Sequence, residues 1–278
     1  TPRMRHTATR LPDGKVLITG GIPSVDFSTP PNQPVLATAE VYDPSTQTFT
    51  RTGDMNTARS SHAAVLLRSG RVLVLGGTRG GQDPGAELYD PATGTFSETG
   101  SPSVKGIVPG MTALLPDGRV LVATAVEENL ARAEIYDPNA GTFSPAGDMA
   151  YPHLRPLTAT VLPNGLVLLT KCYSDDPFNA TELYDPATDR FTAGPDMKRL
   201  RGPGSTATLL PNGNLLIAGR DYGYGSPYGG SAEVYDYQRG TFEQVTAIQA
   251  EEGHTATLLL DGTVLLSGGW KCCGYSLD

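Results

Sequence analysis

One short motif returns along the whole sequence at nearly constant intervals, and this repeat constrains the fold more than any other feature. Its first copy is Ala39-Glu40-Val41-Tyr42-Asp43-Pro44, and every copy ends its strand-like part in Tyr-Asp. The glutamates of the five copies are 47, 47, 48 and 51 residues apart: Glu40, Glu87, Glu134, Glu182 and Glu233. A period of about 40 to 50 residues is typical of four-stranded propeller blades.

Each repeat also contains two short β-patterned segments joined by a tight turn, as in residues 6–21 around Asp13-Gly14. Such Asp-Gly and Asn-Gly turns favour β-hairpins. Equivalent turns occur six times, at Gly14, Gly70, Gly118, Gly165, Gly213 and Gly262. No long segment has helical periodicity. The sequence therefore predicts an all-β, six-bladed β-propeller with four-stranded antiparallel blades.

We expect a single domain over residues 1–278, because the repeat is unbroken. The predicted blades cover approximately residues 4–54, 55–101, 102–148, 149–196, 197–246 and 247–278. The sixth is predicted to be incomplete, since Leu277-Asp278 falls where other copies read Tyr-Asp. An open sheet edge invites pairing with other chains. We expect either that residues 1–5 cover this edge poorly or that the natural chain continues beyond Asp278.

Composition excludes some partners and leaves others open. The net charge is −8 and the pI is about 5.0. An acidic chain is a poor match for the phosphates of a nucleic acid. No apolar run approaches the roughly 18 residues of a membrane span. We therefore expect neither a nucleic-acid partner nor a membrane span.

The two ends of each predicted blade differ in character. Antiparallel geometry places the Asp-Gly turns and the Asp-Pro turns at one end, and both are short and regular. The loops after the second strand and those between blades lie at the other end, and they vary in length and chemistry. We call these the turn end and the variable end. Function usually lies on the variable loops of a rigid scaffold.

The repeat resembles the kelch repeat. A glycine pair closes the second strand, Tyr-Asp-Pro ends the third, and Met55-Asn56-Thr57-Ala58-Arg59 precedes the next blade. The resemblance covers residues 4–278 and is closest to the galactose-oxidase-like branch of bacteria and fungi. Two features depart from the pattern. Blades three and four lack the glycine pair, and phenylalanine replaces the usual tryptophan at Phe49, Phe96, Phe143, Phe191 and Phe242.

The resemblance raises the possibility of a copper-radical oxidase, which needs a Tyr crosslinked to a Cys together with His and Tyr ligands. The positions that match are Arg5, Ser61, Pro109, Pro156, Gly204 and Gly253, and none is Tyr or Cys. His6, His62 and His254 share one repeated position, which favours a structural role. We therefore do not expect copper-radical activity.

A second type of site is suggested by acidic residues and one histidine in the variable loops. Hard oxygen ligands suit Ca²⁺, and adding a histidine suits a transition metal. Solvated loop charges are the alternative explanation, and no cofactor is the simpler expectation. The candidate metal ligands are His153, Asp175, Asp221 and Glu251.

Aromatic and arginine side chains at the variable end give the leading binding hypothesis. Flat rings with a polar tip, set among charged groups, suit sugars and extended peptides. Packing over the blade ends would explain the same residues. The candidate ligand-binding residues are Trp270, Tyr222, Tyr224, Tyr173, Arg155, Arg201 and Arg79.

Two further features have structural explanations. Cys272 and Cys273 are adjacent, which leaves three alternatives: a vicinal disulfide, free thiols, or a disulfide between one of them and Cys172. The repeated glutamates and the arginines Arg59, Arg155 and Arg201 predict a Glu-Arg brace between neighbouring elements.

These features lead to one hypothesis and two alternatives. The hypothesis is an extracellular or cell-surface propeller that recognises a glycan or a protein segment through the variable loops. A metal-dependent lyase or oxidase is the first alternative. The second is a structural repeat segment of a longer surface protein.

Overall fold

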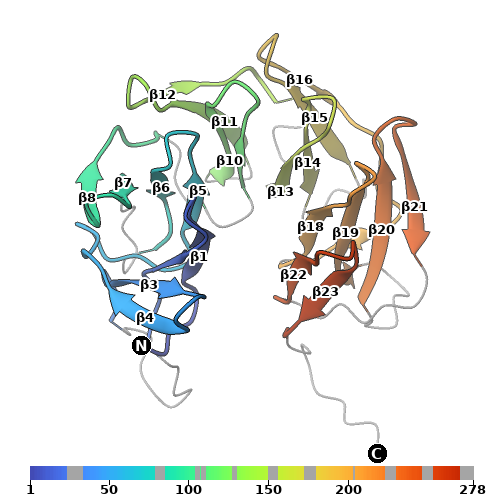
Figure 1. The fold of residues 1–278 in the computed structure, drawn as a ribbon. Coiled ribbons are helices and arrows are strands. Elements are labelled where there is room, and N and C mark those ends of the chain that lie inside the picture. Colours follow the sequence, from blue (N-terminus) through green and yellow to red (C-terminus); the bar gives the residue numbers. More distant parts are fainter. Residues whose placement is uncertain are drawn as a thin grey trace, which may run out of the picture. The chain divides into compact units, whose positions relative to one another are not determined.

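The structure of the protein is a computed structural model of residues 1–278. It describes residues 1–23, 34–78, 85–103, 107, 111–126, 130–149, 156–171, 180–202, 204–222, 230–245 and 253–269. These residues form strands, turns and irregular segments without a helix, so the predicted all-β class is confirmed (Figure 1). Consequently, the described part of the chain has no helix that could cross a membrane.

The described residues group into two compact units. The first comprises Thr1–Val126 and Arg132–Ala146, and the second consists mainly of Gly147–Asp278. We describe each unit by itself. The prediction of one domain over residues 1–278 stays a prediction.

The first unit contains three four-stranded antiparallel blades. In each, the chain moves from one edge of the sheet to the other in sequence order. The first blade is β1 (Thr7–Arg10), β2 (Val16–Thr19), β3 (Ala39–Asp43) and β4 (Thr48–Arg51). The second is β5 (Ala63–Leu66), β6 (Val72–Leu75), β7 (Ala86–Asp90) and β8 (Thr95–Glu98). The third is β9 (Thr112–Leu114), β10 (Val120–Val126), β11 (Leu130–Asp137) and β12 (Thr142–Pro145).

The second unit contains the remaining blades. The fourth is β13 (Pro156–Val161), β14 (Val167–Lys171), β15 (Thr181–Asp185) and β16 (Arg190–Ala193). The fifth is β18 (Thr206–Leu209), β19 (Leu215–Tyr222), β20 (Gly230–Asp236) and β21 (Thr241–Val245), and β17 (Leu200–Arg201) adds to its β19. The sixth has β22 (Thr255–Leu258) and β23 (Val264–Ser267). The prediction of five full blades and a partial sixth is confirmed, while residues 270–278 lie outside the described part.

The repeated Tyr-Asp strand is the third strand of each full blade, and its tyrosine packs on the phenylalanine of the fourth. Tyr89 pairs with Phe96 across the ladder, with ring centroids 4.9 Å apart and planes inclined by 48°. The same tilted pair recurs in all five full blades, at 4.7 to 4.9 Å. Tilted aromatic pairs contribute about 0.5 to 1.5 kcal/mol beyond their buried area. Phenylalanine thus fills the place of the expected tryptophan.

The hydrophobic core lies between the faces of neighbouring blades. Leu17 of the first blade packs with Val72, Val74 and Tyr89 of the second. Residues of the second and third blades form the next cluster, and those of the fourth and fifth form another. Alternate residues of each β-strand point to opposite faces of its sheet. Each inner strand can therefore contact both neighbouring blades.

The glycine pair after the second strand lies where the chain closely approaches both the start of its own blade and the segment before the next blade. The backbone N–H of Gly77 donates to the carbonyl of Ile107 at 2.8 Å, just before the third blade. A Cβ atom on Gly77 would lie 2.6 Å from the carbonyl oxygen of Ser60 and 2.8 Å from Cβ of His62. Its φ of 87° is also a conformation that other residues rarely adopt.

Two hairpins extend well past the usual strand length at the variable end. The strands β10 and β11 of the third blade have 7 and 8 residues, and β19 and β20 of the fifth have 8 and 7. The corresponding strands of the first and second blades have 4 or 5. In the fifth blade, β17 pairs with the extension, with Leu200 opposite Tyr222 and Arg201 opposite Asp221.

Candidate functional site

Most of the residues predicted to form a site lie outside the described part of the chain. This applies to the ligand-binding candidates Trp270, Tyr224, Tyr173, Arg155 and Arg79, to the metal candidates His153, Asp175 and Glu251, and to Cys172, Cys272 and Cys273. Tyr222 is the last residue of β19. Arg201 and Asp221 are described with their side chains.

Arg201 is buried, and both terminal nitrogens of its guanidinium bind groups of the protein itself. Its guanidinium forms ion pairs with Glu233 at 2.8 Å and with Asp221 at 3.1 Å. It also donates to the carbonyls of Gly219 and Ser231, at 3.2 and 2.8 Å. The side chain of Arg201 has no exposed surface. Arg201 and Asp221, predicted separately as ligand-binding and metal residues, therefore lie together and bind each other.

The same brace recurs in the second blade, as the sequence predicted. The guanidinium of Arg59 lies 2.7 Å from Glu87 and donates to the carbonyls of Gly76 and Gly85. In the first blade, Arg3 contacts Glu40 at 3.0 Å. Glu87 also accepts the backbone N–H groups of Asn56 and Thr57. A buried charge must be paired and hydrogen-bonded to be tolerated. In the first, second and fifth blades, the brace therefore ties the segment before the first strand to the third strand of the same blade.

The repeated histidines bind threonines of the preceding blade. Nε2 of His62 lies 2.9 Å from Oγ1 of both Thr7 and Thr19, and Nε2 of His254 lies 2.9 Å from Oγ1 of Thr206. Burial, reinforced by the positive charge of Arg59, lowers the pKa of His62 to about 3. His62 is therefore neutral at physiological pH, which agrees with the structural role expected for this position.

The described residues do not fit copper. Of the six positions where the resemblance would place copper-radical residues, Arg5, Ser61, Gly204 and Gly253 are described with φ between 53° and 73°. They thus share a left-handed backbone conformation, but none carries a thiol, phenol or imidazole. No group of three or more His, Cys, Asp or Glu side chains suited to a metal occurs among the residues described. We derive no chemistry through copper.

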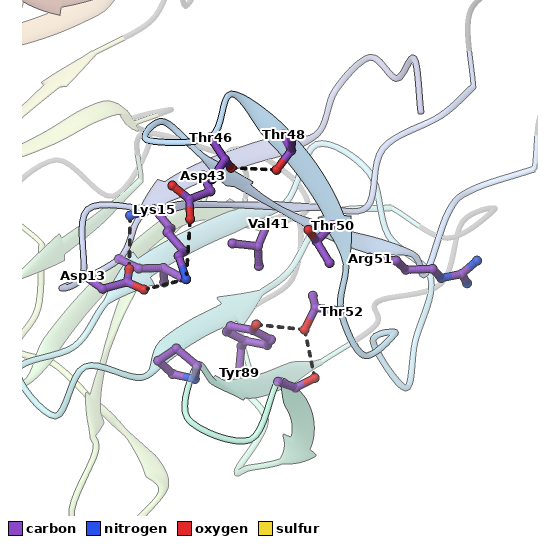
Figure 2. Close-up of a pocket in the computed structure, with 13 residues that line it drawn as sticks. Asp13, Lys15, Val41, Asp43, Thr46, Thr48, Thr50, Arg51, Thr52 and Tyr89 are labelled. Atoms are coloured by element: carbon purple, nitrogen blue, oxygen red, sulfur yellow. Dashed lines mark hydrogen bonds and ion pairs between the residues drawn. The ribbon is translucent and has the colours of Figure 1, made fainter.

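A pocket of about 450 Å³ lies between the first and second blades at the turn end, and we call it the interblade groove (Figure 2). One wall is the outward part of the first blade, where Val41 pairs with Thr50 and Asp43 with Thr48. The β1–β2 turn contributes Lys15 and Asp13. The opposite wall comes from the second blade, at Tyr89, Pro91 and Gly94.

Charges occupy one end of the interblade groove. Nζ of Lys15 lies 3.5 Å from Asp13 and 3.8 Å from Asp43, both beyond a normal hydrogen bond to an ammonium group. The hydroxyl and backbone N–H of Ser45 both donate to Asp43. These hydrogen bonds hold the pKa of the Asp43 carboxyl below its usual value. The end therefore carries two carboxylates and one loosely held ammonium group.

Hydroxyl groups line the rest of the groove. Thr48, Thr50 and Thr52 occupy every second position of β4 and the residue after it, so their side chains share one face of the sheet. The Thr52 hydroxyl donates to the Gly94 carbonyl at 3.1 Å and lies 2.9 Å from the hydroxyl of Tyr89. In contrast, the Thr50 hydroxyl has no hydrogen-bond partner among the described residues.

The interblade groove was not predicted from the sequence, because it is lined by two repeats and lies at the turn end, where the loops are short. One signal was present in the sequence. Threonine occupies every second position of residues 46–52, namely Thr46, Thr48, Thr50 and Thr52. Polar residues at that spacing predict a hydroxyl-lined sheet face.

Comparison with known proteins supports the fold. Residues 2–56 match the Kelch motif. A search of curated proteins gave no match. Among solved structures, a fungal alcohol oxidase of the AA5 family, described as having catalytic diversity and solved in complex with copper, superposes with a TM-score of 0.76 at 19% sequence identity. The match covers 98% of this chain and 59% of the oxidase chain, so this chain spans little more than half of that enzyme.

At 19% identity, the similarity to the oxidase establishes the fold alone. The Kelch match and the observed blades both agree with the resemblance found in the sequence. The chain therefore has the fold of a β-propeller, and a kelch motif is matched within it over residues 2–56.

Proposed function

We propose that this propeller is a binding module that recognises a glycan or a protein segment through the variable ends of its blades. A kelch propeller is in general an interaction or binding scaffold, but the fold does not specify the ligand. The proposal depends on one observation: two hairpins, β10–β11 and β19–β20, are lengthened at the variable end.

Longer strands carry their connecting loops away from the blade on a rigid support. Sites held by strands are positioned more accurately than sites on loops alone. In the fifth blade this support is reinforced, because β17 pairs with β19 and Arg201 binds Asp221 across that pairing. Tyr222, a predicted ligand-binding residue, ends the reinforced strand.

Arg201 acts indirectly in this proposal. Since its guanidinium is buried and bound by Glu233 and Asp221, it holds the lengthened hairpin in place and does not contact the ligand. The contacts would come from Tyr222 and from the residues predicted around it, Trp270 and Tyr224. A location outside the cell is part of the proposal and derives from the glycan class of ligand.

The proposal is tested with the intact chain on a glycan array and on an array of printed peptides. We expect binding to a set of glycans or peptides with a common motif. The double variant Trp270→Ala/Tyr222→Ala should lose that binding, while Thr93→Ala at the turn end of the second blade should retain it. Absence of binding on both arrays, or full binding by the double variant, would contradict the proposal.

A further inference from the structure

The second blade has positions equivalent to those that line the interblade groove, and the side chains there differ. There, Arg71 replaces Lys15 and its Nε contacts Asp90 directly at 3.2 Å. The larger Leu88 replaces Val41 and packs against the hydrophobic cluster of the second and third blades. Between the first two blades, Lys15 and Val41 line a pocket of about 450 Å³.

The unused hydrogen-bonding groups of the groove define what would fit it. Lys15 has three N–H donors and no neighbour within normal hydrogen-bond distance of them among the described groove residues. Asp13 and Asp43 each keep an acceptor oxygen facing this ammonium group. Thr50 offers a hydroxyl that can both donate and accept. Donors and acceptors are thus available side by side.

The shape of the groove adds an apolar contact between these polar groups. Val41 lies between the Lys15 end and the hydroxyl pair of Thr52 and Tyr89, and Arg51 points away from them (Figure 2). A volume of about 450 Å³ is within the range of small-molecule sites. A ligand that matches has an apolar face and hydroxyl groups around its rim.

We propose that the interblade groove binds a single neutral sugar ring or a similar polyhydroxylated molecule. Sugar hydroxyls donate to the carboxylates of Asp13 and Asp43 and accept from Lys15 and Thr50. Two carboxylates against one ammonium group give this end a net negative charge, which disfavours anionic ligands. The site lies at the turn end, so it is independent of the proposed function at the variable end.

The test measures binding of neutral methyl glycosides to the intact chain by saturation-transfer NMR, with methyl glucoside, galactoside and mannoside as probes at millimolar concentration. At least one should bind, and glucuronate should bind more weakly than the uncharged glucoside. The double variant Lys15→Arg/Val41→Leu introduces the residues of the second blade. It should fold, since the repeat already accommodates them, and should weaken binding at least tenfold.

A single substitution tests the proposed hydrogen bond between Thr50 and the sugar. Thr50→Val keeps the shape and removes the hydroxyl, so binding should weaken about fivefold. Ser97→Ala changes the equivalent position of the second blade and should leave binding unchanged. The proposal is wrong if no neutral glycoside binds, if glucuronate binds better than the glucoside, or if the folded double variant binds as well as the natural sequence.

Discussion

The hydroxyl of Tyr89 lies 2.9 Å from Oγ1 of Thr52, so the third strand of the second blade is hydrogen-bonded to the chain leaving the first. Tyr136 and Thr99 repeat this contact at 2.8 Å between the second and third blades. In each case the threonine also contacts the carbonyl of a turn glycine, Gly94 or Gly141. In the second and third blades, the tyrosine of the repeated motif therefore joins neighbouring blades and also packs on the phenylalanine of its own blade.

Replacing Tyr89 by phenylalanine should reveal the contribution of this contact. The ring and its packing on Phe96 remain, while the half-buried Thr52 hydroxyl loses one of its partners. We expect the free energy of unfolding to fall by about 0.5 to 1.5 kcal/mol. Urea unfolding followed by circular dichroism measures it.

Tyr42 provides the matched control. It occupies the same position in the first blade and packs on Phe49, but its hydroxyl has no hydrogen bond among the described residues. Tyr42→Phe should leave the unfolding midpoint nearly unchanged. Equal losses for the two variants would show that the contact between Tyr89 and Thr52 adds no stability.

The buried brace predicts a larger effect. Glu87→Gln removes the charge that faces Arg59, whose side chain has no exposed surface. Breaking a buried pair from one side costs about 3 to 5 kcal/mol, because the other charge stays buried. Thermal unfolding should show a large fall in the melting temperature.

The exposed pair Arg51 and Asp54, at 2.8 Å, is the control for the brace. Exposed pairs contribute about 0 to 1 kcal/mol, so Asp54→Asn should change little. A similar, small effect of both substitutions would contradict the role assigned to the brace.

The sequence predicted those parts of the fold that are encoded locally. The Asp-Gly turns, the alternating strands and the Tyr-Asp motif each depend on a few neighbouring residues, and all appear where they were expected. The brace was also predicted, because Arg59 and Glu87 recur at fixed places in the repeat. Local turn chemistry and periodicity are readable without knowledge of distant contacts.

Features formed between repeats were not predicted. The sequence gives no reason why Nε of Arg71 lies 3.2 Å from Asp90 while Nζ of Lys15 stays 3.8 Å from Asp43 at one end of the groove. Arg201 was assigned both to the brace and to a ligand, since its burial cannot be inferred from position in the repeat. The structure places it in the brace.

His62 predicts how stability depends on pH. Its pKa is about 3 in the folded protein and about 6.5 when unfolded, so between these values only the unfolded chain takes up a proton. Stability should therefore fall as the pH falls from 6.5 towards 3, by about 1.4 kcal/mol per pH unit. The variant His62→Gln removes this contribution.

The measurement compares the natural sequence with the His62→Gln variant by urea unfolding at several pH values from 7 to 4. Carboxylates alter stability in both, so the difference between them isolates the histidine. Between pH 6 and 5, the natural sequence should lose about 1 kcal/mol more than the variant. Parallel curves would mean that the pKa of His62 is the same in the folded and unfolded protein.

Gly77 and Gly14 separate two reasons for a glycine, which are a left-handed backbone and a lack of space for a side chain. Both have φ of 87°, but a Cβ on Gly77 would meet the backbone of the first strand region at 2.6 Å, whereas a Cβ on Gly14 would meet nothing within 4 Å. Gly14→Ala should cost only the strain of a left-handed residue, about 1 to 2 kcal/mol. Gly77→Ala should cost that strain and also displace Ser60 and His62 at the start of the same blade, because the added Cβ would lie within 3 Å of both. Unfolding in urea should thus show a clearly larger loss for Gly77→Ala, and equal losses would mean that the close approach of Gly77 to Ser60 and His62 relaxes without cost.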